Sequence, residues 1–309
     1  MVFNSFLARS NKFQKRVPRI NLHSPFERGK WATARRYLQW RMMRLTRATM
    51  HVLGAGKWLD PRGFEARYER VCIANLPAPF HGLKLAHLSD FHCGAYMSES
   101  AALRVLERAW EDEPDLVALT GDFVEYHPEE IRQIIEPLKQ MPAPPLGIYA
   151  VLGNHDYMMG KDEAIVQALR EANVRCLRNE SIRLEKDGQG IWLTGVEDHW
   201  RGTIDFHAAL SSITTNEPRI LLCHTPDVIG HARDHGYALM LSGHTHGGQW
   251  VLPMLGPAKI YSLNGKDFIG GSVQVGPTRL HVSRGIGMAT LPLRINCPPE
   301  FTILTLCRD

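Results

Sequence analysis

Two histidines, His244 and His246, stand one residue apart within a glycine-rich stretch, residues 243–249. Imidazole nitrogen is the commonest side-chain ligand of transition metals in proteins, so this pair could hold metal ions. The flanking glycines lack a Cβ and allow the backbone to come close to an ion or a phosphate. An isolated pair of this kind is more often a solvated polar turn, so the rest of the chain has to decide between the two interpretations.

Three further groups of metal-binding residue types directly follow predicted buried strands. Residues 83–89 precede Asp90 and His92, residues 116–120 precede Asp122, and residues 148–152 precede Asn154, His155 and Asp156. Predicted helices separate these strands, which is typical of an α/β sheet. Ligands of such sheets bind beyond the carboxyl ends of the strands. We therefore expect all three groups to meet at one edge of the sheet.

The second half of the chain repeats this arrangement of apolar strand and polar loop. Residues 220–223 form a predicted strand that leads into His224, and residues 239–242 lead into His244 and His246. The other predicted strands are residues 67–73, 182–184, 191–196, 272–275, 280–283 and 301–306. The predicted helices are residues 99–111, 129–140 and 161–171. A second sheet is therefore expected to pack near the first.

The collected donors have the chemistry of a site for two metal ions. They are Asp90, His92, Asp122, Asn154, His224, His244 and His246. Imidazole nitrogens mixed with carboxylate and amide oxygens suit Mn²⁺, Fe²⁺ or Zn²⁺ better than Ca²⁺ or an all-thiolate zinc site. Seven donors exceed the needs of one tetrahedral ion but suit two ions if one carboxylate bridges them. Two ions roughly 3.5–4 Å apart can clamp a phosphoryl group and lower the pKa of a bound water.

The order of these groups resembles that of the calcineurin-like metallophosphoesterases, over about residues 65–309. The resemblance implies an α/β fold with four layers, an αββα sandwich. It assigns Asp90, His92 and His246 to one ion, Asn154, His224 and His244 to the other, and Asp122 to a bridge. It also implies that His155 acts on the leaving-group oxygen, as proton donor or charge stabiliser, and that Asp156 orients His155. Mn²⁺ is the expected metal, with Fe²⁺ or Zn²⁺ as alternatives.

A finer resemblance involves residues 283–287 and 294–300, which read Ser-Arg-Gly-Ile-Gly and Arg-Ile-Asn-Cys-Pro-Pro-Glu. They are similar to a subgroup of bacterial membrane-associated phosphodiesterases that includes a UDP-2,3-diacylglucosamine pyrophosphohydrolase. This implies hydrolysis of UDP-2,3-diacylglucosamine to UMP and lipid X, a step of lipid A biosynthesis. The alternatives are a soluble phosphodiesterase or phosphatase of broad specificity and a non-catalytic scaffold that binds metal.

Arg284 lies in the glycine-rich turn of that first segment. Its guanidinium could bind the diphosphate of a substrate in a bidentate manner, or it could hold the turn itself. Cys93 and Cys223 flank the predicted ligands. We expect these two thiols to pack behind the ligands and not to act as nucleophiles, because hydrolysis by activated water needs no covalent intermediate.

The N-terminal part of the chain differs in charge from the remainder. Residues 1–57 hold thirteen Lys and Arg and one Glu, a charge of about +12, whereas the rest carries about −8. Apolar residues at helical spacing predict an amphipathic helix at residues 31–53, with arginines opposite the apolar stripe. Such a helix suits an anionic membrane surface, or it packs on the catalytic domain. We expect a basic arm at residues 1–60, a catalytic domain at residues 61–309, and no binding of nucleic acid.

The sequence shows no apolar run long enough for a membrane-spanning helix and no secretory signal. The six cysteines show no close pairing. A reduced, cytoplasmic protein is therefore expected, bound peripherally at the inner face of the cytoplasmic membrane.

Overall fold

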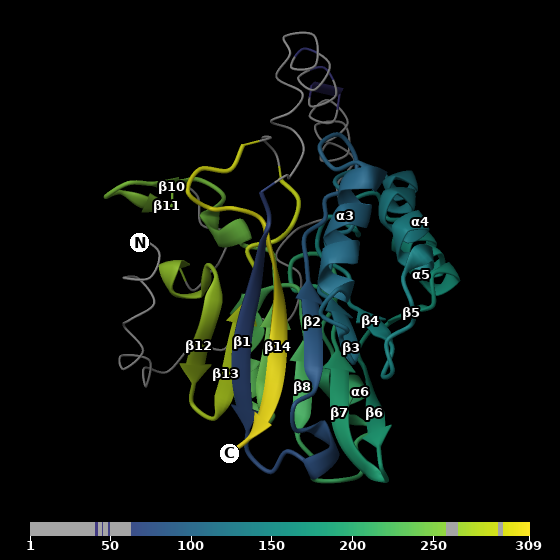
Figure 1. The fold of residues 1–309 in the computed structure, drawn as a ribbon, viewed down its shortest axis with the longest axis vertical. Helices are drawn as coiled ribbons and strands as arrows, with labels where there is room; N and C mark the ends of the chain where they lie inside the picture. The colour runs from purple at the N-terminus through teal and green to yellow at the C-terminus, as the bar shows by residue number, and fades with distance from the viewer. Residues whose placement is uncertain (1–40, 43–44, 46–48, 50–62, 258–264, 290–292) are drawn as a thin grey trace.

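The apolar strands form two six-stranded mixed sheets in the computed structural model of the chain (Figure 1). The structure describes residues 41, 42, 45, 49, 63–257, 265–289 and 293–309. The first sheet has the order β1 (Glu65–Ile73), β14 (Glu300–Arg308), β2 (Lys84–Leu88), β3 (Leu116–Leu119), β4 (Ile148–Ala150) and β5 (Val174–Cys176). From β2 to β5 the strands are parallel, whereas β14 is antiparallel to β2.

The second sheet has the order β12 (Gly271–Val275), β13 (Thr278–Val282), β9 (Leu239–Ser242), β8 (Arg219–Leu222), β7 (Gln189–Gly195) and β6 (Glu180–Lys186). Its four central strands, β13 to β7, are parallel. A turn at Asp187 and Gly188 joins β6 to β7 as an antiparallel hairpin, and both residues have a positive φ. That conformation is the one an Asp-Gly hairpin turn requires.

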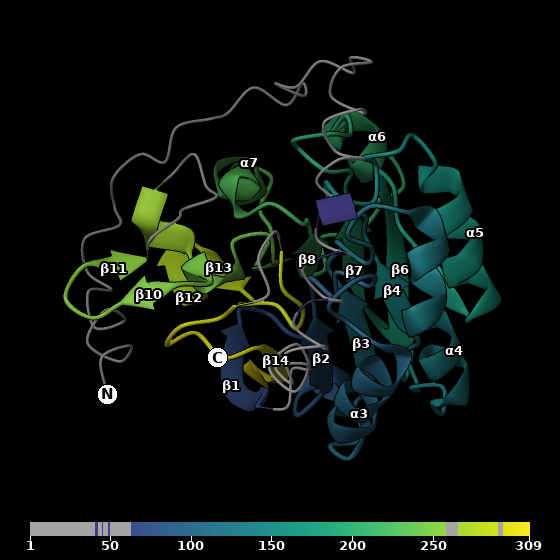
Figure 2. The same ribbon diagram turned by 90° about the horizontal axis from the view of Figure 1, so that it is seen from above.

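Helices cover the outer face of each sheet. Figure 2 shows α3 (Glu99–Trp110), α4 (Arg132–Gln140) and α5 (Asp162–Glu171) along one side of the molecule, beyond the first sheet. The shorter helices α6 (Phe206–Leu210) and α7 (Ile229–Asp234) pack with the outer face of the second sheet. Both short helices and β5 were absent from the sequence prediction.

The alternation of side chains along the strands explains the four layers. In β3, Val117 and Leu119 pack in the cluster beneath the helices, whereas Leu116 and Ala118 pack in the cluster between the two sheets. A strand with apolar residues on both faces has to be covered on both faces, by helices on one side and a sheet on the other. The predicted four-layer αββα sandwich is confirmed.

The cysteines differ from the expectation of a fully reduced chain. Cys72 and Cys307 form a disulfide. They lie at directly paired positions of β1 and β14, although 235 residues separate them in sequence. The sequence prediction was wrong here because it looked for pairing at short spacing. Cys93 and Cys223 are buried free thiols, as expected.

The predicted amphipathic helix at residues 31–53 falls mostly outside the described residues, as does the boundary near residue 60. The described positions 41, 42, 45 and 49 are helical and exposed, and Thr49 Oγ1 donates to the Leu45 carbonyl at 2.9 Å. Over the part of the chain that the structure describes, no helix has both the length and the apolarity needed to cross a bilayer.

Candidate metal centre

The loops that carry the predicted ligands converge at one end of the sandwich. In Figure 1 the arrowhead of β14 points to the lower end, and β2 runs antiparallel to β14, so the loop after β2 lies at the upper end. Because β3 and β4 are parallel to β2, their following loops lie at the same end. The donors after β8 and β9 meet those of the first sheet there, in groups whose ligand atoms lie within 4.8 Å of one another.

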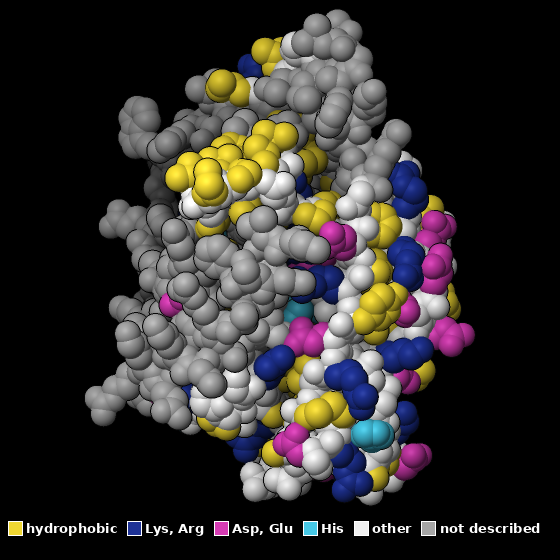
Figure 3. Space-filling view, turned by 60° about the vertical axis from the view of Figure 1, so that its left-hand side comes forward, with side chains coloured by type: hydrophobic (Ala, Val, Ile, Leu, Met, Phe, Trp, Pro, Cys, Tyr) yellow, Lys and Arg dark blue, Asp and Glu magenta, His cyan; other side chains and the backbone are white. Residues whose placement is uncertain are grey.

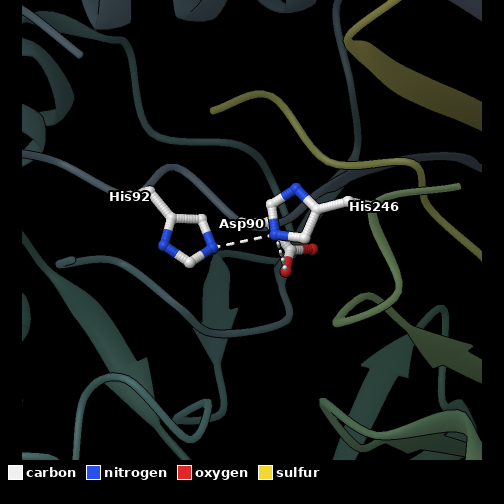
Figure 4. A group of neighbouring side chains, drawn as sticks. All are labelled: Asp90, His92 and His246. Carbon is white, nitrogen blue, oxygen red and sulfur yellow. Dashed lines mark hydrogen bonds and ion pairs between the residues drawn. The ribbon is translucent and has the colours of Figure 1, made fainter. Parts of the chain in front are cut away.

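Asp90, His92 and His246 form the first group of donors. Their side chains point toward one another from two different loops (Figure 4). The two Nε2 atoms of His92 and His246 are 2.9 Å apart, and His246 Nε2 is 3.4 Å from Asp90 Oδ1. This is the set that the sequence assigned to one ion.

Asp122, His224 and His244 form the second group. His224 Nε2 lies 3.2 Å from both Asp122 Oδ2 and His244 Nδ1. The same Asp122 Oδ2 lies 3.5 Å from His92 Nε2 in the first group. One carboxylate oxygen therefore faces both groups, which is the position that a bridging ligand has to take.

The imidazoles are oriented by partners behind them. His92 Nδ1 is paired with the Glu125 carboxylate, and His224 Nδ1 donates to the Thr120 carbonyl at 2.6 Å. With Nδ1 protonated, Nε2 presents a lone pair to the site, which is how metal-binding histidines are commonly held. Glu125 was not identified from the sequence, although it is an acid only three residues after Asp122.

The backbone of the ligand loops is strained. Five predicted ligands have a left-handed φ, namely Asp90, His92, Asp122, His244 and His246, with φ between 46° and 69°. Non-glycine residues adopt this region rarely, and such strain concentrates at functional sites. Packing is also tight: a Cβ on Gly243 would collide with the side chains of Ser89 and Asp90. This glycine is required for close approach of the two sheets' loops.

The buried carboxylates make the centre strongly attractive to cations. Burial would lower the pKa of His92 and His224, but neighbouring carboxylates outweigh it and raise these pKa values to about 9 and about 10. Burial, together with the charge of His224, lowers the pKa of His244 to about 3. The negative charge of Asp122 and Glu125 is thus balanced only in part, because only some of the imidazoles carry an extra proton.

The donor set fits two divalent first-row ions. Asn154 Oδ1 is buried and has no hydrogen-bond partner among the described residues. A buried amide oxygen without a partner is costly unless an unseen group satisfies it, and a metal ion would do so. Asn154 lies between Gly153 and His155, and the His155 amide donates to Asp122 Oδ1 at 2.8 Å. The second group would then hold an ion through Asn154, His224 and His244, with Asp122 shared.

His155 lies beside the first group and remains partly exposed. Its ring packs edge-on against His92 at 4.6 Å, and Nδ1 donates to the Glu125 carbonyl at 2.8 Å. This contact fixes the ring and directs Nε2 away from Glu125. The side chain of His155 is 14% exposed, so a substrate at the centre can reach it.

Asp156 has contacts other than those expected. Its carboxylate accepts hydrogen bonds from the backbone amides of four residues, Asp122, Phe123, Val124 and Gly153, at 2.8–3.2 Å. Burial, and then the charge of Asp122, raise its pKa to about 7. The described contacts orient the His155 ring through Glu125, whereas Asp156 fixes the loop that carries Asp122.

Arg284 is also engaged by the protein itself. Its guanidinium forms ion pairs with Glu300 at 2.5 Å and Glu65 at 2.6 Å, and only 5% of the side chain is exposed. These contacts favour the structural alternative, and the substrate-binding role stays a prediction. Arg294 lies beside a predicted ligand, since its NH2 group is 3.3 Å from His246 Nδ1, and it donates to the backbone carbonyls of Gly285 and Gly287.

Comparison with known proteins agrees with this centre. Residues 83–248, which include all seven predicted ligands, match the model of the calcineurin-like phosphoesterase family. The chain is 34% identical to the uncharacterized metallophosphoesterase YkuE of Bacillus subtilis, over 82% of this chain and 89% of that protein. It is 31% identical to the phosphodiesterase YaeI of Escherichia coli, over 88% of this chain and 98% of that protein. A transmembrane protein with metallophosphoesterase domain from Danio rerio is 32% identical over 76% of this chain and 55% of that protein.

The geometry and the relatives lead to the same conclusion. Asp122 faces histidines of two groups of buried His and Asp donors, and the family match spans the loops that carry them. The chain belongs to the calcineurin-like metallophosphoesterase family and is a metal-dependent phosphoesterase.

Proposed function

We propose that the protein hydrolyses a phosphodiester or diphosphate bond at a centre of two divalent ions, with Mn²⁺ as the expected metal. The observation that carries this proposal is the position of Asp122, which faces both donor groups with one oxygen. Bound there, the two ions would neutralise phosphate charge and activate water.

The protein's own residues have distinct parts in this reaction. The ligand loops exclude bulk water, because Asp90, Asp122 and His224 are almost fully buried. His155, the more exposed imidazole, stabilises or protonates the leaving oxygen through Nε2. Glu125 positions both His92 and His155, since its carboxylate pairs with the first and its carbonyl accepts from the second.

The proposed substrate is amphipathic, with UDP-2,3-diacylglucosamine as the best candidate and UMP and lipid X as products. Support comes from the resemblance of residues 283–287 and 294–300 to enzymes of that kind. The relative YaeI is named a phosphodiesterase, which agrees with the bond type and leaves the substrate to be tested.

We also propose that residues 31–53 contact an anionic membrane surface. The described helical positions Met42 and Leu45 are 60% and 70% exposed and belong to the predicted apolar stripe. One relative is named a transmembrane protein with metallophosphoesterase domain. The proposed location is the inner face of the cytoplasmic membrane, although the Cys72–Cys307 disulfide removes cysteine usage as an argument for that side.

The bond type is tested with bis-p-nitrophenyl phosphate. Chelation should abolish its hydrolysis, and Mn²⁺ should restore it. A rate that survives chelation and dialysis would contradict the two-ion proposal.

The substrate is tested by mass spectrometry of the purified enzyme with UDP-2,3-diacylglucosamine. Release of UMP at a rate well above that for bis-p-nitrophenyl phosphate supports the proposed substrate. Hydrolysis of the chromogenic diester without release of UMP would favour the alternative, a soluble phosphodiesterase or phosphatase of broad specificity. Absence of both activities in the metal-loaded protein would favour a non-catalytic scaffold.

A further inference from the structure

A short hairpin next to the metal centre exposes an unusual run of apolar residues. Strands β10 (Val251–Leu252) and β11 (Gly256–Pro257) form a two-stranded sheet of their own. Between them, Met254 is fully exposed and Leu255 is 75% exposed, and Leu252 is 37% exposed. Four consecutive apolar residues, 252–255, are thus presented to solvent.

The backbone conformation and the side chain at the turn of this hairpin are unusual for a solvent-exposed position. Met254 has a φ of 64°, a conformation in which hairpin turns favour glycine or asparagine. A large apolar side chain at this position gains nothing from the described protein, because it is fully exposed. Exposed apolar groups of this kind mark a surface for a partner or a membrane.

The hairpin is fastened to the segment that supports the metal centre. Trp250 Nε1 donates to the Leu293 carbonyl at 2.6 Å, and the Val251 amide donates to the Ile295 carbonyl at 2.9 Å. Leu293 is itself 49% exposed. We call the exposed residues Leu252, Pro253, Met254, Leu255 and Leu293 the apolar tip. Its base is close to the ligands in sequence, since Trp250 is four residues after His246 and Arg294 contacts His246.

The apolar tip lies at the same end of the sandwich as the metal centre. In Figure 1 the β10–β11 hairpin projects from the upper part of the molecule, and in Figure 3 hydrophobic side chains gather at that end. The arginines that follow the hairpin in the chain are engaged by the protein: Arg279 pairs with Glu69, Arg284 pairs with Glu65 and Glu300, and Arg294 donates to backbone carbonyls. The basic charge that favours a negatively charged partner is therefore that of residues 1–57, about +12.

We propose that the apolar tip inserts into the interfacial region of an anionic lipid bilayer and holds the metal centre at the lipid surface. Exposed Leu and Met on a chain whose N-terminal part is strongly basic are the combination found in proteins that bind an anionic membrane surface. The proposal deepens the proposed membrane contact of residues 31–53 and rests on it, because it adds a second anchor on the catalytic domain. A substrate with acyl chains could then reach the centre without leaving the bilayer.

Insertion is tested with an environment-sensitive fluorophore on the full chain. Cys176, a partly exposed free thiol, is replaced by Ser, and NBD is attached to Met254→Cys or, as the control, to Asp187→Cys. Asp187 is exposed in the β6–β7 turn at the opposite end of the sheet. Vesicles of phosphatidylglycerol and phosphatidylcholine should shift the emission of the probe at 254 to the blue and leave the probe at 187 unchanged. No shift at 254, or equal shifts at both positions, would overturn the proposal.

A second variant separates binding from chemistry. Leu255→Asp should weaken binding to the same vesicles by about tenfold or more, while hydrolysis of bis-p-nitrophenyl phosphate stays unchanged. Unchanged vesicle binding would overturn insertion of the tip, and a dimer that Leu255→Asp dissociates would assign the tip to a second copy of the chain. Neither result depends on turnover, so failure of the proposed phosphodiesterase activity remains distinguishable.

Discussion

The two ends of the sandwich differ in what surrounds the residues with a positive φ. At the carboxyl end of the parallel strands, the left-handed conformation falls on ligands such as Asp90, His92 and His244. At the other end it falls on turn residues such as Asp187, Gly188 and Gly236, and an added Cβ on either glycine would meet nothing within 4 Å. The backbone of the ligand loops is strained and closely packed, whereas the turns at the opposite end have open space around them.

The two ends of the sandwich also differ in how their acidic side chains are paired. The carboxyl end buries Asp90, Asp122 and Glu125 together. Toward the other end, Glu69 of β1 has a full set of partners in the second sheet, and the disulfide joins β1 to β14. The centre is therefore organised to bind cations and not to stabilise the metal-free chain, whereas the rest of the sandwich supplies that stability.

The largest effect is expected at the shared carboxylate. Asp122→Asn keeps the size of the side chain but removes the charge that faces both donor groups. Activity on bis-p-nitrophenyl phosphate should fall by about three orders of magnitude or more. Mn²⁺ should also no longer raise the melting temperature, because ligand-induced stabilisation needs a site. A variant with normal metal-induced stabilisation would contradict the bridging position.

The substitution His155→Ala distinguishes a role in catalysis from a role in metal binding at the same end of the sandwich. The ring touches His92 but belongs to neither ion's predicted ligand set. We expect kcat to fall by about 10²–10⁴-fold, with the Mn²⁺-induced rise in melting temperature retained. Full activity in this variant would remove its assigned role at the leaving oxygen.

A matched pair of glycine substitutions tests the contrast in crowding. Gly243→Ala places a Cβ against Ser89 and Asp90, so both activity and Mn²⁺-induced stabilisation should be largely lost. Gly188→Ala meets open space and should cost only about 1–2 kcal/mol of backbone strain, with unchanged kcat. Equal effects of the two substitutions on activity would refute the difference between the ends.

The smallest effect concerns the pH dependence of stability. Burial raises the pKa of Glu69, but hydrogen bonds and charge from His281, Ser272 and Arg279 outweigh it and lower the pKa from 4.5 to about 2. A depressed folded-state pKa contributes stability above pH 4.5 that is lost as the pH falls through about 2.

Glu69→Gln should therefore lower the free energy of unfolding by about 1–3 kcal/mol at pH 7, less some screening by solvent. The difference from the wild type should vanish toward pH 2 in denaturant titrations. The control is Glu136→Gln, which disrupts an exposed pair with Lys139 and should change stability by under about 1 kcal/mol. A Glu69 effect that is independent of pH would contradict the ion-pair explanation.

The sequence predicted those features of the fold and the site that depend on residues close together in the chain. Short, mostly apolar runs followed by Asp or His predicted β2, β3, β8 and β9 and the loops after them. The four layers followed from family resemblance and not from periodicity, because a buried strand does not reveal what covers it. Helices α6 and α7, with five and six residues, are too short for a helical period to be recognised.

Long-range contacts were the part that the sequence could not supply. The Cys72–Cys307 disulfide depends on β1 pairing with β14, and no spacing signal connects two strands 235 residues apart. Glu125 lies behind His92 because the loops after β2 and β3 pair with each other, with the Glu125 amide donating to the Cys93 carbonyl at 2.9 Å. The family resemblance implied that Asp156 orients His155, whereas in the fold its carboxylate accepts hydrogen bonds from four backbone amides.

The central claim is that two ions share Asp122 between two groups of donors. Crystals grown with Mn²⁺ and measured near the manganese absorption edge test it most directly. The account predicts two anomalous peaks about 3.5–4 Å apart, one beside Asp90, His92 and His246, and one beside Asn154, His224 and His244. A single peak in fully loaded crystals, or peaks away from Asp122, would contradict it.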